Sequence, residues 1–281
     1  TPGGRPMRAS REYPFTWEEF EALRRLVVAH TGIVVADTKF EMFYSRFARR
    51  LRALGLRDFR DYLALLRQGD AAEIHQLINA ITTNLTGFFR EPHHFEFLAK
   101  TLVPRWAARP GAPLRIWSAG CASGEEPYSI AMVLLEHLAD APRRDLRILA
   151  TDLDTQALAQ ADAAIYPADR MGPLAHPPWR RWVLRGRGER AGLIRMRPEV
   201  RALVHPRRLN LIGDWPLERR YDAIFCRNVM IYFDAPTKRR LVDRLADRLG
   251  DQGHLFLGHA ESLIGLSQRL RPVARTVYAL A

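Results

Sequence analysis

The sequence of 281 residues has few cysteines and no long apolar run. Its two cysteines, Cys121 and Cys226, fall in segments predicted to be buried, so a disulfide scaffold is not expected. No apolar stretch has the length needed to cross a bilayer, and residues 1–14, predicted as a flexible tail, lack the hydrophobic centre of a signal peptide. Internal repeats are also absent. These features favour a folded cytoplasmic protein.

Several catalytic and nucleotide-binding motifs are missing too. The chain has no phosphate loop with its lysine, no G-x-G-x-x-G fingerprint and no G-x-S-x-G nucleophile turn. Its nine histidines include the neighbours His93 and His94, which we expect to point in different directions at the start of a helix, without cysteines or carboxylates at ligand spacing. They are predicted to pack or cap, and no metal is expected.

The composition is that of a basic globular protein. Hydrophobic residues make up 47% of the chain, which is long enough for two modest domains. The 43 lysines and arginines exceed the 31 aspartates and glutamates by 12. This excess indicates an acidic partner, either nucleic acid or an acidic protein surface.

The first hundred residues show helical patterns. Thr16 and Glu19 form a capping-box signal for a helix that ends near His30, and apolar residues at helical spacing predict a second helix over 37–54 with a basic opposite face. Further helices are expected over 59–66, 71–81 and 92–106. The sequence therefore predicts an all-α domain over 15–106, followed by a proline- and glycine-containing linker at 107–113.

Strand and helix patterns alternate after the linker. Strands are expected over 114–118, 146–151, 202–205, 221–226, 253–258 and 276–280, which indicates a mainly parallel, doubly wound α/β sheet with helices on both faces. Residues 167–199 interrupt this pattern with two short strand-like runs, 182–185 and 193–196, joined by a glycine-rich turn. They predict an inserted β-hairpin.

The segment from Leu114 to Met132 reads LRIWSAGCASGEEPYSIAM, which predicts a strand, a glycine turn and a helix. Such a turn usually cradles a ligand, and helix N-termini attract anions. Glu125 and Glu126 would repel a pyrophosphate, so the turn favours a cation such as an ammonium or sulfonium. Alternatively, Glu126 only completes a capping box with Ser123. The segment alone leaves both interpretations open.

Polar residues also follow the other predicted strands, where ligands bind in this fold class. Asp152 is placed to accept hydrogen bonds from a ribose, although a helix N-cap is the alternative, which Asp154 could equally fill. The remaining candidates are Asn210 and Leu211 for an adenine, Arg227 and Asn228 for the pocket, and Tyr232 shortly after them.

Several segments of the chain together resemble a known family. The segments TTNLTGFFREPHHF, WSAGCASGEEPYSIA, TDLDTQAL, IFCRNVMIYFD and LGHAESL, with the closing TVYAL, are similar to those of the CheR family in the same order. These are S-adenosylmethionine-dependent methyltransferases that esterify glutamates on bacterial chemotaxis receptors. Gly87 and Gly120 stand where the family often has alanine.

The resemblance implies a Rossmann-like methyltransferase domain over 114–281 with a small antiparallel β-subdomain at about 167–199. It implies S-adenosylmethionine as cofactor and S-adenosylhomocysteine as product. By similarity, Asn84, Thr86 and Arg90 reach the cofactor from the N-terminal domain, and one of Glu125 and Glu126, with Glu126 favoured, binds the methionine ammonium. The implied cofactor set also contains Asp152, Asn210, Leu211, Arg227 and Asn228.

Arg90 and Tyr232 are the residues that the family places nearest the methyl transfer. A glutamate carboxylate has a reference pKa of about 4.3 and is already a nucleophile at neutral pH, so no general base is required. We expect Arg90 to guide the incoming carboxylate and the Tyr232 hydroxyl to orient one of its oxygens.

The resemblance also implies partners. Members of the family are thought to face the acidic methylation helices of the receptor with the helical domain, which makes Arg46, Arg49 and Arg50 candidate contacts. The hairpin resembles the β-subdomain of members that bind a receptor C-terminal pentapeptide, and an ordinary exposed hairpin is the alternative. Its candidate residues are Arg185, Gly186, Arg187, Gly188, Gly192 and Arg195. A monomer recruited to membrane receptor arrays is expected, without membrane insertion.

Two other functions compete with this prediction. The basic charge would suit a nucleic-acid methyltransferase, but the N/D-P-P-aromatic loop typical of base amino-methylation is replaced here by Arg227-Asn228-Val229-Met230. A receptor-tail binding module with a decayed cofactor site is disfavoured because Arg90, Asp152, Asn228 and Tyr232 are all present.

Overall fold

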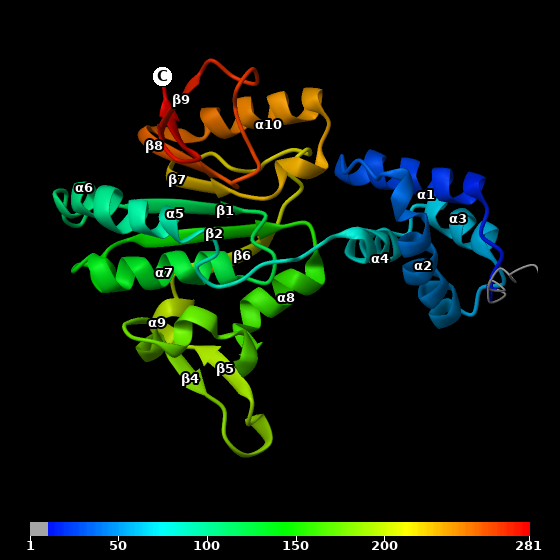
Figure 1. The fold of residues 1–281 in the computed structure, drawn as a ribbon, viewed down its shortest axis with the longest axis horizontal. Helices are drawn as coiled ribbons and strands as arrows, with labels where there is room; N and C mark the ends of the chain where they lie inside the picture. Colours follow the sequence, from blue (N-terminus) through cyan, green and yellow to red (C-terminus); the bar gives the residue numbers. More distant parts are fainter. Residues whose placement is uncertain (1–10) are drawn as a thin grey trace, which may run out of the picture. The chain divides into compact units, whose positions relative to one another are not determined.

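The computed structural model describes residues 11–281, which divide into a first unit ending at Ile81 and a second unit beginning at Thr82 (Figure 1). Of the predicted tail, residues 1–10 lie outside the described part of the chain. Within residues 11–281, no helix combines the length and the apolar character needed to cross a membrane.

The first unit is all-helical, as predicted. It contains α1 (Trp17–Thr31), the short turn η1 (Asp37–Lys39), α2 (Phe40–Leu54), α3 (Phe59–Arg67) and α4 (Ala71–Ile81). The predicted capping box is confirmed, because the Glu19 N–H donates to Thr16 Oγ1 at 3.2 Å and the Thr16 N–H donates to the Glu19 carboxylate at 2.8 Å. Apolar side chains spaced along the helices, including Phe20, Phe43 and Phe47, form a separate core.

The boundary between the units differs from the predicted linker at 107–113. The second unit already includes α5 (Pro92–Phe97), the π-helical turn η2 (Leu98–Leu102) and α6 (Val103–Ala107). Leu98, Leu102 and Trp106 are buried in the same core as Ile116 of the first strand. Residues 82–113 therefore belong to the second unit, because their apolar face packs there. Local helical spacing could not assign them to one core or the other.

The second unit is built on a seven-stranded sheet in the order β6-β2-β1-β7-β8-β10-β9. Its strands are β1 (Leu114–Ala119), β2 (Leu146–Asp152), β6 (Val204–Arg208), β7 (Tyr221–Cys226), β8 (Leu249–Leu257), β9 (Leu270–Ala274) and β10 (Val277–Leu280). The first five in this order run parallel, and β10 is antiparallel to both of its neighbours. The predicted mainly parallel α/β sheet is confirmed.

Helices flank this sheet (Figure 1). They are α7 (Glu125–His137), α8 (Thr155–Ala163), α9 (Pro198–Arg201) and α10 (Ala235–Asp247), with the short turns η3 (Ala141–Arg143) and η8 (Met230–Tyr232). Because β1 lies between β2 and β7 and is parallel to both, the segments that follow these three strands meet at one edge of the sheet. Glu125, Glu126, Asp152, Arg227 and Asn228 lie at or just beyond the ends of these three strands.

The predicted hairpin is part of a separate three-stranded antiparallel sheet. β4 (Val183–Arg185) pairs with β5 (Leu193–Met196), and β3 (Ile165–Pro167) pairs with the other side of β5. The short helical turns η4 (Ala168–Arg170), η5 (Gly172–Ala175), η6 (Trp179–Trp182) and η7 (Gly188–Arg190) complete the insertion. Strand β4 is therefore an edge strand of this small sheet.

Candidate active site

The glycine turn after β1 needs its glycines for geometric reasons. Gly120 has φ +85°, and its N–H and that of Cys121 donate to the Thr151 carbonyl at 2.8 and 2.9 Å. A Cβ on Gly120 would lie 2.4 Å from Val229 Cγ2. The alanine common in the family at this position would be strained here, because the loop after β7 packs directly on the turn.

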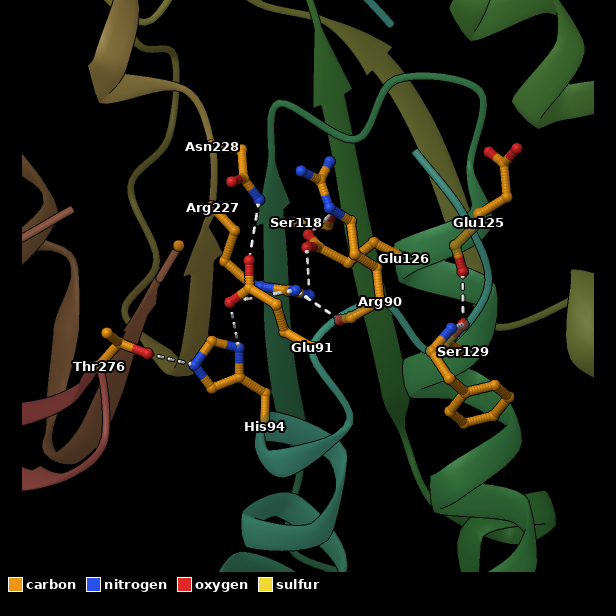
Figure 2. A network of polar contacts seen from close by, with 12 residues as sticks. Arg90, Glu91, His94, Ser118, Glu125, Glu126, Ser129, Arg227, Asn228 and Thr276 are labelled. Atoms are coloured by element: carbon orange, nitrogen blue, oxygen red, sulfur yellow. Dashed lines mark hydrogen bonds and ion pairs between the residues drawn. The ribbon is translucent and has the colours of Figure 1, made fainter. Parts of the chain in front are cut away.

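The two adjacent glutamates point in different directions (Figure 2). Glu126 accepts hydrogen bonds from Ser118 Oγ at 2.7 Å and Arg227 Nη1 at 3.1 Å. Glu125 is buried and accepts from Ser123 Oγ at 2.6 Å. The predicted capping box of Ser123 with Glu126 is not formed, since α7 begins after Gly124 without a side-chain cap. Glu126 is thus the glutamate directed at the strand ends.

Arg227 lies between two carboxylates (Figure 2). Its Nη1 donates to Glu126, while its Nη2 donates to the Arg90 carbonyl and lies 3.6 Å from Glu91 Oε2. The side chain is only 2% exposed, and its buried Nε has no hydrogen-bond partner among the described residues. Burial raises the pKa of Glu126, and the Arg227 charge opposes that shift. The arrangement offers both a half-buried carboxylate and a free donor to a zwitterionic ligand.

Glu91 is a second central carboxylate, which the sequence interpretation missed. It accepts from Asn228 Nδ2 at 3.3 Å and is 3.1 Å from His259 Nδ1, and it adopts the left-handed conformation with φ +59°. Burial alone would raise the pKa of Glu91, but His259, Arg227 and Asn228 together lower it to about 2. The one available signal was its place in the motif REPHHF, directly after Arg90.

The neighbouring histidines do not point apart as predicted. His93 and His94 both direct Nε2 at Thr276 Oγ1, at 3.4 and 2.7 Å, and His94 Nδ1 lies 3.7 Å from Glu91 Oε2. One ligand atom from each of His93, His94 and Glu91 falls within 4.8 Å of the others, so a carboxylate is present after all. The Arg227 guanidinium next to Glu91 would repel a cation, and we assign no metal to this cluster.

Asp152 is anchored by backbone donors at the end of β2. It accepts from the N–H groups of Ala122 at 2.8 Å and Asp154 at 2.9 Å, and burial raises its pKa. The N-cap of α8 is Asp154, so the capping alternative for Asp152 is wrong. Asn84 Nδ2 donates to Asp154 at 2.6 Å, which ties the segment around Asn84 and the half-buried Thr86 to this helix.

The loop carrying Asn210 and Leu211 follows β6. Asn210 Oδ1 accepts from the Ile212 N–H at 3.1 Å, and Leu211 is buried. Arg244 of α10 donates to the carbonyls of Leu211 and Gly213 and lies 3.9 Å over the Trp215 ring. Sequence spacing gave no sign of Arg244, because its partners are backbone carbonyls of a distant loop.

Arg90 and Tyr232 approach the site from different segments. Arg90 is half-buried, and its Nη1 donates to the Leu85 carbonyl at 2.7 Å. Tyr232 is also half-buried, at the end of η8. Burial raises the pKa of the Tyr232 hydroxyl, and the positive charge of Arg90 acts in the opposite direction.

The predicted receptor contacts have unequal surroundings. Arg46 donates to the Ala80 carbonyl, and Arg50 forms a two-point pair with the buried Glu73, so both stabilise the helical unit from within. Arg49 is exposed and makes no hydrogen bond or ion pair with another of residues 11–281.

In the small sheet, Arg185 and Arg187 are exposed, whereas Arg195 is half-buried. The hairpin glycines serve the turn itself. A Cβ on Gly186 would lie 1.9 Å from the Arg190 carbonyl oxygen, and Gly188 and Gly192 have φ values of +59° and +83°.

Comparison with known proteins identifies the two units. The family model "CheR methyltransferase, all-alpha domain" matches residues 18–82, and "CheR methyltransferase, SAM binding domain" matches residues 84–279. A chemotaxis protein methyltransferase 2 of Pseudomonas aeruginosa is 43% identical over 98% of this chain and 98% of its own. A chemotaxis protein methyltransferase of Escherichia coli is 42% identical over 93% of this chain and 90% of its own. The chain belongs to the CheR methyltransferase family, with S-adenosylmethionine as its cofactor.

Proposed function

We propose that this protein transfers the methyl group of S-adenosylmethionine to glutamate carboxylates of chemotaxis receptors, giving glutamate methyl esters. The observation that carries the proposal is the group formed by Glu126, Arg227 and Arg90 at the strand ends of a family methyltransferase fold (Figure 2). The relatives named above are chemotaxis protein methyltransferases. An ionised glutamate needs no general base, and the site offers cationic and hydroxyl groups that suit an anionic acceptor.

The residues present fit the cofactor. Glu126 is a half-buried carboxylate suited to the methionine ammonium, and the unpartnered Nε of Arg227 suits the cofactor carboxylate. Asp152 would take the ribose hydroxyls, and the Asn210–Leu211 loop the adenine. Asn84, Thr86 and Asn228 would complete the cofactor site. When bound, the cofactor supplies an electrophilic methyl group on a sulfonium.

Arg90 and Tyr232 are the residues we assign to the acceptor. Arg90 guides the glutamate carboxylate, and the Tyr232 hydroxyl donates a hydrogen bond to the oxygen that does not react. The raised pKa of Tyr232 keeps that hydroxyl protonated at neutral pH. Positioning is the larger part of both roles, because a tight ion pair with Arg90 would weaken the nucleophile.

Transfer of labelled methyl from S-adenosylmethionine to receptor-containing membranes tests the proposal. A carboxyl ester releases volatile methanol in base, so base-labile label on the receptor is expected. Receptor in which the candidate glutamates are replaced by alanine is the matched control and should stay unlabelled. Base-stable label on nucleic acid would instead support the competing nucleic-acid methyltransferase.

We infer that the exposed Arg49 of α2 contributes to receptor recognition. An exposed cation steers an acidic partner through long-range attraction, which salt screens. Arg49→Glu should slow association with the receptor most strongly at low salt. Arg67→Glu, on α3 of the same unit and also exposed, is the charge-matched control and should change association less.

We propose that the open edge of β4 binds a receptor C-terminal pentapeptide of aromatic-acidic-aromatic character and so recruits the enzyme to receptor arrays. The edge strand can pair with an extended peptide, while Arg185 and Arg187 are exposed near its end and can meet an acidic side chain or the terminal carboxylate. Peptide titration monitored by NMR should shift signals of β4. Shifts elsewhere, or none, would leave the hairpin as an ordinary surface element.

A further inference from the structure

Glu261 is a buried carboxylate in the segment between β8 and β9, outside both the proposed cofactor set and the proposed acceptor pair. Its side chain accepts four backbone N–H groups. Oε2 accepts from Asn228 at 2.9 Å and Gly258 at 2.6 Å, and Oε1 accepts from Val229 at 3.0 Å and Met230 at 2.8 Å. The residue is 6% exposed. A single side chain therefore joins the segments that follow β7 and β8.

The loop held by Glu261 contains several residues of the site. Arg227 directly precedes Asn228, Val229 and Met230, whose N–H groups donate to the Glu261 carboxylate. The short turn η8 begins at Met230 and ends at Tyr232. Asn228 is held with φ +59°, which a non-glycine residue adopts only at a cost in free energy. In that conformation its Nδ2 reaches Glu91, the residue next to Arg90. The Glu261 hydrogen bonds thus act on both proposed acceptor-binding residues.

The surrounding backbone is shaped for this contact. A Cβ on Gly258 would lie 2.9 Å from the Asn228 nitrogen and 2.9 Å from Glu261 Oε2, so glycine is needed for the two segments to approach. On the other side, Val229 packs against Gly120 of the turn after β1. Two contacts therefore hold the loop after β7: the packing of Val229 on Gly120 and the hydrogen bonds to Glu261.

We propose that Glu261 is a positioning residue for methyl transfer, which holds Tyr232 and Asn228, and through Asn228 the segment bearing Arg90, in the geometry that the reaction needs. The inference rests on the proposed roles of Arg90 and Tyr232. Glu261 contacts only backbone N–H groups in this network, so it positions the site residues through the loop, and its charge in addition raises the pKa of the Tyr232 hydroxyl. A carboxylate is required because both oxygens accept two N–H groups each.

Two substitutions separate this role from simple packing. Glu261→Gln preserves size but replaces one accepting oxygen with an NH₂ group that faces two N–H donors. Glu261→Asp preserves both accepting oxygens but is one methylene shorter. If packing matters most, Gln should retain more activity than Asp. If the acceptors matter, Asp should retain more than Gln.

The experiment measures kcat and the KM for receptor at saturating S-adenosylmethionine, at a temperature where circular dichroism shows each full-length variant folded. We expect kcat of Glu261→Gln to fall at least about tenfold with receptor KM within about twofold, and Glu261→Asp to be intermediate. Glu136→Gln is the control, since Glu136 has a 7%-exposed side chain and pairs with Arg181 at the other end of α7, ~15 Å along that helix from Glu126.

Unchanged kcat in folded Glu261→Gln, equal loss in the Glu136 control, or greater activity of Gln than Asp would overturn the inference. Failure of both Glu261 variants to fold would also overturn it, by making the residue purely structural. Tyr232→Phe and Arg90→Ala are assayed alongside. If these two retain full activity, the proposed acceptor roles fail. If they lose activity while Glu261→Gln does not, only the role of Glu261 fails.

Discussion

Glu126→Gln tests which of the two adjacent glutamates binds the methionine ammonium. The substitution keeps the shape of the side chain, and its amide oxygen can still accept from Arg227 while its NH₂ group can donate to Ser118 Oγ. The fold should therefore survive. What is lost is the negative charge directed at the strand ends, where the cofactor ammonium would bind.

The size of the effect follows from the interaction that is removed. A hydrogen bond between charged groups contributes about 1.5–3 kcal/mol net, and each 1.4 kcal/mol changes a dissociation constant about tenfold. Glu126→Gln should therefore weaken S-adenosylmethionine binding roughly 10- to 100-fold. Isothermal titration calorimetry of both proteins with S-adenosylmethionine measures this change directly.

Glu125→Gln is a closely matched control. Glu125 is the neighbouring residue and is buried, and its carboxylate accepts from Ser123 and lies 3.8 Å from Arg170. Figure 2 shows this carboxylate turned away from Arg227. Its substitution should change cofactor affinity less than about threefold. Equal losses in the two variants, or a larger loss for Glu125→Gln, would refute the assignment of the ammonium to Glu126.

Three further predictions concern turnover, pH and the glycine turn. Arg90→Ala should reduce turnover by at least about tenfold with a much smaller change in cofactor affinity, and calorimetry showing lost affinity with intact turnover would contradict the guiding role. Burial lowers the pKa of His94 to about 3, whereas the unfolded chain binds the extra proton already below pH 6.5. The free energy of unfolding should therefore fall by roughly 1.4 kcal/mol for each pH unit below 6.5. Denaturation curves should show a shallower pH dependence for His94→Gln. Gly120→Ala should cost about 1–3 kcal/mol because of its positive φ and the contact with Val229, whereas Gly87→Ala, with open space around its Cβ, should be nearly neutral in the same measurement.

The fold was largely predictable because its signals are local. Capping at Thr16, the periodic phenylalanines of α2 and the alternating strands after Leu114 each depend on residues close in sequence. The domain boundary was not predictable in this way. The helices over 92–107 carry the same apolar spacing as those of the first unit, and only their packing on the sheet shows which core they join.

The site was predictable where residues follow strands, and less so where it depends on contacts across the chain. Asp152 and Arg227 could be chosen because parallel strands bring their ends together. Glu91 and Glu261 could not, since their importance comes from partners 33 to 168 residues away in the sequence, which the tertiary structure brings near. Arg50 shows the opposite error. Its place on a basic helix face predicted a receptor contact, but its side chain pairs with the buried Glu73 of the same unit.

The division between Ile81 and Thr82 bears on how such a protein can diversify. The proposed cofactor and acceptor residues, from Asn84 to Tyr232, and the core beneath them belong to the second unit, while the first unit has its own core and its own internal ion pairs. Substitutions on the outer faces of α1–α4 can therefore accumulate without disturbing the chemistry of methyl transfer. If Arg49 contacts the receptor as proposed, that part of receptor preference can evolve at a different rate from catalytic competence in one chain.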